Sequence, residues 1–217
     1  MKAIFLDIDG VIQPISSRER FEHINEIEDV AKELDKAYHD EHFYNDYVTL
    51  ERHPYEQYSS AHTRKCNLAA VYYDWSKKSI LSLKNIIESS DARLVISSDW
   101  RDHGERVMRS FLAIYELEQY FYGMLDGTFG RPSEEQVKAR EFFNSIKSEL
   151  YDYRAADIRQ YLSVHPEITS YVAIDDLNLG FPVKDHFVHC NDGVLDERKS
   201  NLAIEILKRA DGPYLIK

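Results

Sequence analysis

Four short apolar runs stand out along the chain, and polar or turn-forming residues follow them. Continuous apolar runs of this length, bounded in this way, are typical of strands that are buried on both faces of a sheet. The runs lie at residues 2–6, 93–96, 171–174 and 186–189, and the last is the weakest. We therefore expect four buried strands.

Helical patterns fill the stretches between these runs. Apolar residues recur there every three or four positions, which indicates helices with one buried face. Ser133-Glu134-Glu135-Gln136, after Pro132, is a capping box that opens one of them. The expected helices cover residues 76–89, 103–118, 133–150 and 154–163 and a C-terminal segment around 202–207. Alternating strands and helices predict an α/β fold, a parallel sheet with helices on both faces.

The segment from residue 15 to residue 73 does not follow this alternation. It is dense in charged residues, histidine and tyrosine, and residues 26–47 have a helical pattern. We interpret it as a mainly helical insertion after the first strand, which leaves residues 1–14 and 74–217 as the core domain. Ligands of such sheets bind beyond the carboxyl ends of the strands. We expect the insertion to pack over that end.

Composition limits the partners and the compartment. The 217 residues include 27 lysines and arginines and 38 aspartates and glutamates, which gives a formal net charge of −11. Such a chain is repelled by a nucleic-acid backbone, so we expect no long nucleic acid as partner. The N-terminal apolar run is too short for a signal peptide, and no stretch approaches the ~20 apolar residues of a membrane helix. We expect a cytoplasmic protein that binds no membrane.

Asp7-Ile8-Asp9-Gly10 carries the strongest chemical signal. Asp7 and Asp9 stand two residues apart at a strand end, so their carboxylates point the same way, and Gly10 permits a sharp turn. Two adjacent like charges are unfavourable unless one is protonated or a cation lies between them. A cation would let Asp7 approach a phosphate, and a raised pKa would let Asp9 act as general acid and base. A strand end with a simple Asp-Gly turn has the same pattern.

Asp175 and Asp176 form a second acidic pair, directly after the third apolar run. Carboxylate and carbonyl oxygens are the ligands that Mg²⁺ prefers. One or both aspartates could therefore complete a Mg²⁺ site with Asp7, the backbone carbonyl of Asp9 and waters. The alternative interpretation is a helix cap or a turn, which uses the same residue types.

Ser97 and Ser98 follow the second apolar run. A hydroxyl and neighbouring backbone N–H groups at such a position can hold a phosphate oxygen, although serines also cap helices there. Arg101 follows shortly and could clamp an anion through two parallel hydrogen bonds. Trp100 could stack on a base, but we favour packing in the core for it.

These segments resemble the motifs of the haloacid dehalogenase (HAD) superfamily. Residues 5–12 look like its motif I, residues 95–98 like motif II and residues 172–176 like motif IV, in the same order and strand contexts. A closer similarity, to the HAD phosphatase domains of RNA-repair proteins, is carried by residues 97–101, 154–162 and 173–176. The resemblance spans the chain apart from the insertion.

The resemblance implies a Rossmann-like core with a mobile cap at the C1-type position, and Mg²⁺-dependent hydrolysis of phosphomonoesters through an aspartyl-phosphate. It makes Asp7 the nucleophile, Asp9 the general acid/base and Ser97 or Ser98 the ligand of the transferring phosphoryl group. From this resemblance, together with the reasoning from the residues above, we expect Asp7, Asp9, Asp175 and Asp176 to bind the metal, and Gly10, Ser98 and Arg101 to bind the substrate.

Motif III is where this sequence departs from the superfamily pattern. The pattern has a basic residue, commonly lysine, ahead of motif IV. Arg154 is our first candidate for this catalytic cation and Lys147 is the second. Arginine keeps the positive charge but presents it as a planar fork rather than as a point charge.

The function expected from the sequence is that of a Mg²⁺-dependent phosphatase. Its substrate would be a small phosphorylated metabolite or nucleotide, or the phosphate at a nucleic-acid end. A phosphotransferase would use the same residues, and a dehalogenase would share the carboxylates, although the Asp175-Asp176 pair suits a metal-dependent reaction better. A non-catalytic HAD-fold binding protein is a further alternative, with the insertion as its binding surface.

Overall fold

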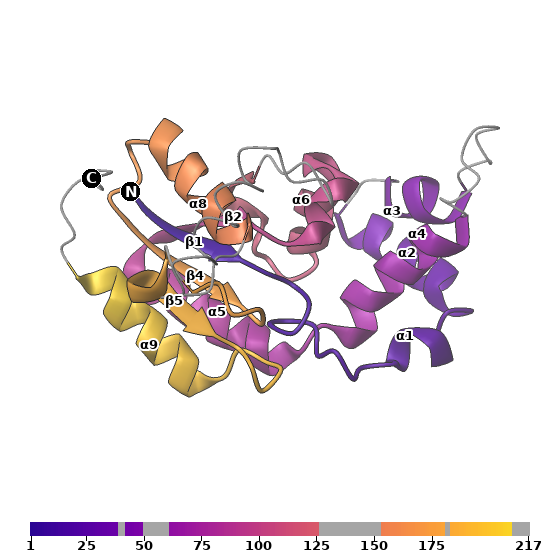
Figure 1. Cartoon of the computed structure of the whole chain (residues 1–217). Coiled ribbons are helices and arrows are strands. Elements are labelled where there is room, and N and C mark those ends of the chain that lie inside the picture. Colours follow the sequence, from indigo (N-terminus) through magenta and orange to yellow (C-terminus); the bar gives the residue numbers. More distant parts are fainter. Residues whose placement is uncertain (39–41, 50–60, 126–152, 181–182, 210–217) are drawn as a thin grey trace.

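The described strands form one parallel sheet, which fixes the frame of the molecule. The computed structural model describes residues 1–38, 42–49, 61–125, 153–180 and 183–209. Five strands pair in the order β3-β2-β1-β4-β5 (Figure 1). Their bounds are β1 (Lys2–Leu6), β2 (Ala92–Ile96), β3 (Phe121–Met124), β4 (Ser170–Asp175) and β5 (Phe187–His189). All four predicted strands are confirmed.

β1 lies in the middle of the sheet, and its neighbours end level with it. Leu6, its last residue, pairs with Ile96 of β2 and with Ile174 of β4. The residues that follow these three strands therefore start from adjacent points on one edge of the sheet. The chain adds β2 and β3 on one side of β1 before it returns to add β4 on the other, and such a reversal of strand order is where open α/β sheets bind ligands.

Helices cover both faces of the sheet, as expected for an α/β fold. The described core helices are α5 (Lys77–Ser90), α6 (Glu105–Ala113), α8 (Tyr153–Val164) and α9 (Glu197–Lys208). The short 3₁₀ turns of the core are η3 (Asp99–His103), η4 (Glu118–Tyr120) and η5 (Lys184–His186). α5 and α9 lie on one face and α8 on the other (Figure 1). The predicted helix over residues 133–150 lies outside the described residues.

Two apolar clusters stabilise this arrangement, one on each face of the sheet. Alternating residues of β1 divide between them: Ile4 and Leu6 join the cluster with α5 and α9, whereas Ala3 and Phe5 join the cluster with α8. A strand that is apolar on both sides is what a doubly covered parallel sheet requires. The continuous apolar run of β1 therefore follows from its central position.

β3 was not predicted from the sequence. Its four residues include Gly123, which weakens the apolar pattern that marks the other strands. A Cβ at Gly123 would lie 2.7 Å from the hydroxyl oxygen of Tyr161, so the close approach of α8 explains the glycine. The helix before β3 is also shorter than predicted, since α6 ends at Ala113 and Glu116 adopts a left-handed conformation with φ +59°.

The described part of the insertion is helical. Its elements are α1 (Glu19–Glu22), α2 (Ile27–Tyr38), α3 (His42–Tyr44) and α4 (Ala61–Ala69), with π-helical turns at η1 (Asn45–Thr49) and η2 (Ala70–Asp74). The predicted helix over residues 26–47 is thus not one described element. In Figure 1 these helices lie beyond the carboxyl ends of the central strands.

The insertion and the core share apolar contacts. Phe43 and Leu68 belong to the same buried cluster as Phe111 of α6. At the connection to the core, the buried carboxylate of Asp74 accepts a hydrogen bond from Ser17 at 2.9 Å and forms an ion pair with Arg20 at 2.8 Å. Because the packing is continuous, the boundary between cap and core stays a prediction.

Among the described residues, no helix combines the length and the hydropathy needed to cross a bilayer.

Candidate active site

Three carboxylates meet at the carboxyl ends of β1 and β4. Asp7 follows β1, Asp175 ends β4, and both are buried, while Asp176 is half-buried. One oxygen of each carboxylate lies within 4.8 Å of an oxygen of each of the others. The sheet itself sets this spacing, since the Asp7 amide donates to the carbonyl of Ile174 at 3.0 Å. The structure thus brings Asp7, of the first acidic pair that the sequence singled out, together with both members of the second pair.

Arg154 supplies the positive charge of this cluster. It lies in the first turn of α8, and its side chain is 12% exposed. Its Nη1 atom lies 2.7 Å from Oδ2 of Asp175 and 3.2 Å from Oδ2 of Asp7. The residue proposed for motif III therefore contacts both buried carboxylates. Lys147, the second candidate, lies outside the described residues.

Burial acts on the acidity of the two inner carboxyl groups. The pKa of Asp7 is raised by desolvation and then by the neighbouring Asp175, and the positive charge of Arg154 opposes this rise. Desolvation also raises the pKa of Asp175, again against the effect of Arg154. Three carboxylates gather here beside the guanidinium of Arg154. A divalent cation would balance their negative charge.

The chemistry of the donors fits a hard divalent cation. Asp7, Asp175 and Asp176 offer carboxylate oxygens, and neither cysteine nor histidine belongs to this group. Mg²⁺ prefers oxygen ligands of this kind, whereas zinc sites in proteins use mainly nitrogen and sulfur. The acidic cluster can therefore hold a metal ion of the Mg²⁺ type.

Gly10 allows Asp176 to reach this cluster. Its φ is +70°, a conformation that favours glycine, and an added Cβ would lie 2.4 Å from Oδ2 of Asp176. The glycine is thus explained by its neighbour within the protein. Its predicted contact with substrate stays a prediction.

Asp9 lies at the surface, beside the buried cluster rather than within it. Its Oδ1 accepts a hydrogen bond from Nε2 of Gln13 at 2.7 Å, and its Oδ2 accepts one from Nε1 of Trp100 at 2.9 Å. Desolvation by the surrounding packing raises its pKa, against the hydrogen bond from Trp100. The atom of Asp9 that the sequence analysis expects to bind Mg²⁺ is its backbone carbonyl oxygen, and that role stays a prediction.

The two serines after β2 differ in their contacts. The Ser98 hydroxyl lies beside Asp7 and opposes the rise in the pKa of that carboxyl, and it accepts a hydrogen bond from the backbone N–H of Trp100 at 3.4 Å. Ser97 continues the sheet, since its amide donates to Leu6 at 2.9 Å. Both are buried. Of the two, Ser98 is therefore the one in contact with the central carboxylate.

Arg101 supports the loop after β2. Its Nη1 donates to the carbonyl oxygens of Ser97 at 2.8 Å and of Ser98 at 3.2 Å. Asp99 lies 3.7 Å from the same nitrogen. The guanidinium thus holds the backbone that carries the Ser98 hydroxyl. The anion clamp expected of Arg101 stays a prediction.

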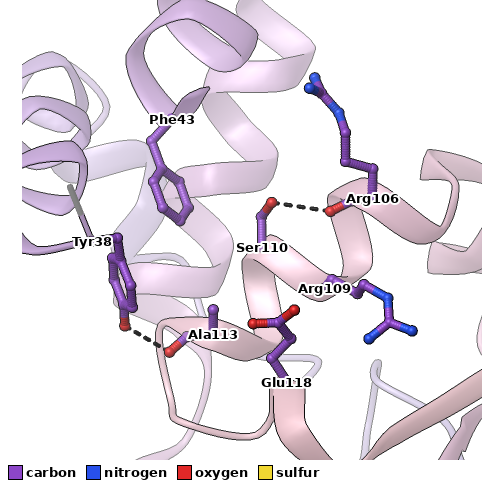
Figure 2. A pocket seen from close by; sticks show the side chains of 7 residues that line it. All are labelled: Tyr38, Phe43, Arg106, Arg109, Ser110, Ala113 and Glu118. Atoms are coloured by element: carbon purple, nitrogen blue, oxygen red, sulfur yellow. Dashed lines mark hydrogen bonds between the residues drawn. The ribbon is translucent and has the colours of Figure 1, made fainter. Parts of the chain in front are cut away.

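A separate pocket lies between the insertion and α6. Figure 2 shows Tyr38 and Phe43 on one side of it and residues of α6 on the other. Its volume is about 420 Å³, and the hydroxyl of Tyr38 donates to the carbonyl of Ala113 at 2.6 Å. The residues that line it are Tyr38, Phe43, Arg106, Arg109, Ser110, Ala113 and Glu118. None of the carboxylates described above is among them, so the pocket is distinct from the candidate active site.

Comparison with known proteins gives one result. A family model described as the HAD domain in Swiss Army Knife RNA repair proteins matches residues 3–198. The matched span contains all three motif regions and Arg154. No curated protein and no solved structure gives a significant match.

Proposed function

This chain belongs to the family of HAD domains in Swiss Army Knife RNA repair proteins, and we propose that it is a Mg²⁺-dependent phosphatase acting on phosphomonoesters. Membership confirms the resemblance predicted from the motifs and supports hydrolase chemistry of the HAD type. The observation that carries the finer proposal is the meeting of three carboxylates and one buried arginine at the ends of β1 and β4. Hydrolysis of a phosphate ester at this cluster needs both a nucleophile and positive charge that neutralises the phosphoryl oxygens.

Asp7 is the proposed nucleophile. It lies at the centre of the cluster, in contact with Arg154 and Ser98. Its carboxylate would attack phosphorus and form an aspartyl-phosphate while the bond from phosphorus to the leaving oxygen breaks. A Mg²⁺ ion held by Asp7, Asp175 and Asp176 would supply positive charge for the phosphoryl oxygens. Arg154 and the Ser98 hydroxyl would orient the same group.

Asp9 is the proposed general acid and base. It stands two residues from Asp7 and faces the surface, from which a substrate arrives. In the first step its proton would pass to the leaving alcohol. In the second step it would take a proton from the water that attacks the aspartyl-phosphate, which releases inorganic phosphate and restores Asp7.

The proposed substrate is the terminal phosphate of an oligonucleotide, or a small phosphorylated molecule. The occurrence of this domain in RNA repair proteins supports the first class. The net charge of −11 opposes binding of a long polynucleotide but not of a chain end. Residues 15–73 would act as the cap that limits access to the strand ends.

Phosphate release from a substrate panel tests this proposal. The panel contains an aryl phosphate, nucleotides, sugar phosphates and oligonucleotides with 3′- or 5′-phosphates, each with Mg²⁺ or with a chelator. We expect release with Mg²⁺, loss of release with the chelator, and loss of release in Asp7→Asn. Asp102→Asn, at an exposed position, is the matched control and should retain activity. Full activity of Asp7→Asn would exclude Asp7 as nucleophile.

A further inference from the structure

Two buried side chains donate hydrogen bonds to the carboxylate of Asp9. Gln13 is 4% exposed and Trp100 is 8% exposed, whereas Asp9 itself lies at the surface. The two donors bind different oxygens of Asp9. Nε2 of Gln13 lies 2.7 Å from Oδ1, and Nε1 of Trp100 lies 2.9 Å from Oδ2. A carboxyl group held at both oxygens cannot rotate freely about its side-chain bonds. Each oxygen retains a second lone pair, so a proton can still be carried on the exposed side.

Both donors are themselves fixed in place. The carbonyl of Gln13 accepts a hydrogen bond from the Gly10 amide at 2.8 Å, which closes the loop that carries Asp9. The indole of Trp100 makes edge-to-face contacts with Trp75 and Phe111, at centroid distances of 5.9 Å and 5.8 Å. The orientation of Asp9 is therefore determined by the packed core.

The indole of Trp75 shows that satisfying a buried N–H group does not by itself explain this contact. Trp75 is 2% exposed and packs against Trp100 in the same aromatic cluster. Its Nε1 is buried and has no hydrogen-bond partner among the described residues. Of these two neighbouring indoles, that of Trp100 is the one directed at a carboxylate among the described residues.

We propose that Trp100, together with Gln13, is a positioning residue that orients Asp9 for proton transfer to the leaving oxygen. This proposal rests on the proposed phosphatase function. Loss of the indole N–H would let the carboxyl group turn away from the leaving oxygen, and small misplacements of a catalytic group are costly. The loss should matter most where the leaving oxygen needs a proton.

Two classes of ester separate this role from a structural one. An alkyl phosphate such as glycerol 2-phosphate has a basic leaving oxygen, whereas p-nitrophenyl phosphate has a leaving oxygen that departs without much protonation. We expect Trp100→Phe to lower kcat/KM roughly 10- to 100-fold for the alkyl ester and by less than about threefold for the aryl ester. Trp75→Phe, which removes an indole from the same cluster, should leave the ratio of the two kcat/KM values unchanged.

Gln13→Met gives a second variant that removes a donor to Asp9 without touching the tryptophan. Gln13→Met should also lower kcat/KM selectively for the alkyl ester. It keeps the proposal testable if Trp100→Phe fails to fold.

The indole N–H resonances, assigned from the two tryptophan variants, report the hydrogen bond between Trp100 and Asp9 directly. Asp9→Ala should shift the Trp100 resonance and leave that of Trp75 in place.

The outcomes are distinct. The enzyme could be active while Trp100→Phe lowers kcat/KM equally for both esters, or while Trp75→Phe lowers kcat/KM selectively for the alkyl ester. Either result would overturn the positioning role and leave the phosphatase proposal intact. Absence of phosphate release from every substrate by the unmodified chain would overturn the proposed function and the catalytic role of Trp100 together. An unchanged Trp100 resonance in Asp9→Ala would refute the hydrogen bond on which the role depends.

Discussion

Gly10→Ala adds one methyl group at the point where the first motif touches the second acidic pair. The φ of Gly10 is +70°, and the new Cβ would lie 2.4 Å from Oδ2 of Asp176. A left-handed conformation costs an ordinary residue about 1–2 kcal/mol, and overpacking costs about 1–3 kcal/mol. We therefore expect Gly10→Ala to lower the free energy of unfolding by about 2–5 kcal/mol.

Gly193→Ala is the matched control for backbone strain. Gly193 has a φ of +97°, and nothing lies within 4 Å of a Cβ added there. This variant carries strain without a steric conflict, so its cost should be about 1–2 kcal/mol. The difference between the two variants isolates the contact between Gly10 and Asp176.

Urea unfolding and calorimetric Mg²⁺ titration measure the two consequences. The added methyl group pushes the carboxylate of Asp176 away from Asp7 and Asp175, so Gly10→Ala should weaken Mg²⁺ binding roughly 10- to 100-fold. Gly193→Ala should bind Mg²⁺ as the unmodified chain does. Equal Mg²⁺ affinity in the two variants would refute the reasoning that Gly10 makes room for a metal ligand.

Three further substitutions test other contacts. Arg154→Lys keeps a positive charge but loses the fork that reaches two carboxylates, so steady-state kinetics should show kcat lowered roughly 10-fold or more; an unchanged kcat would contradict this. Ser98→Ala should lower kcat more than Ser97→Ala, because the Ser98 hydroxyl contacts the proposed nucleophile, and equal losses would argue against that assignment. Asp74→Asn leaves Arg20 without its buried counter-charge and should lower the unfolding free energy by about 2 kcal/mol in urea, a change that an exposed pair would not show.

The strands were predictable where burial on both sides made the sequence uniformly apolar. β1 and β4 are the clearest cases, since every residue of β4 is buried and only Lys2 of β1 is half-buried. β3 lies at the edge of the sheet and contains Gly123, so its pattern is weak. Its aromatic residues, Phe121 and Tyr122, favour a strand and were the available signal.

The acidic cluster was predictable because the ends of parallel strands share one edge of the sheet. The three carboxylates follow apolar runs in the sequence, at Asp7, Asp175 and Asp176. Because β1 and β4 are adjacent in the sheet, these side chains come together. The proximity of Arg154 was expected only from its place before motif IV. Spacing in the sequence alone does not bring a helix residue to a carboxylate 21 positions away.

The contact between Trp100 and Asp9 could not be predicted from the sequence. Packing in the core was expected for Trp100 and is confirmed, but its hydrogen bond joins residues 91 positions apart. Only the three-dimensional path of the loops after β1 and β2 sets that distance. A buried indole usually finds an acceptor, and this was the one available hint.

Detection of phosphate on Asp7 tests the central claim most directly. The chain is mixed with substrate and Mg²⁺, quenched in acid during turnover, digested and mapped by mass spectrometry, with hydroxylamine treatment to identify an acyl phosphate. Our account predicts a labile phosphate on the peptide that contains Asp7, and none in Asp7→Asn. Turnover with the phosphate on another residue, or with no phosphorylated peptide at any quench time, would contradict it.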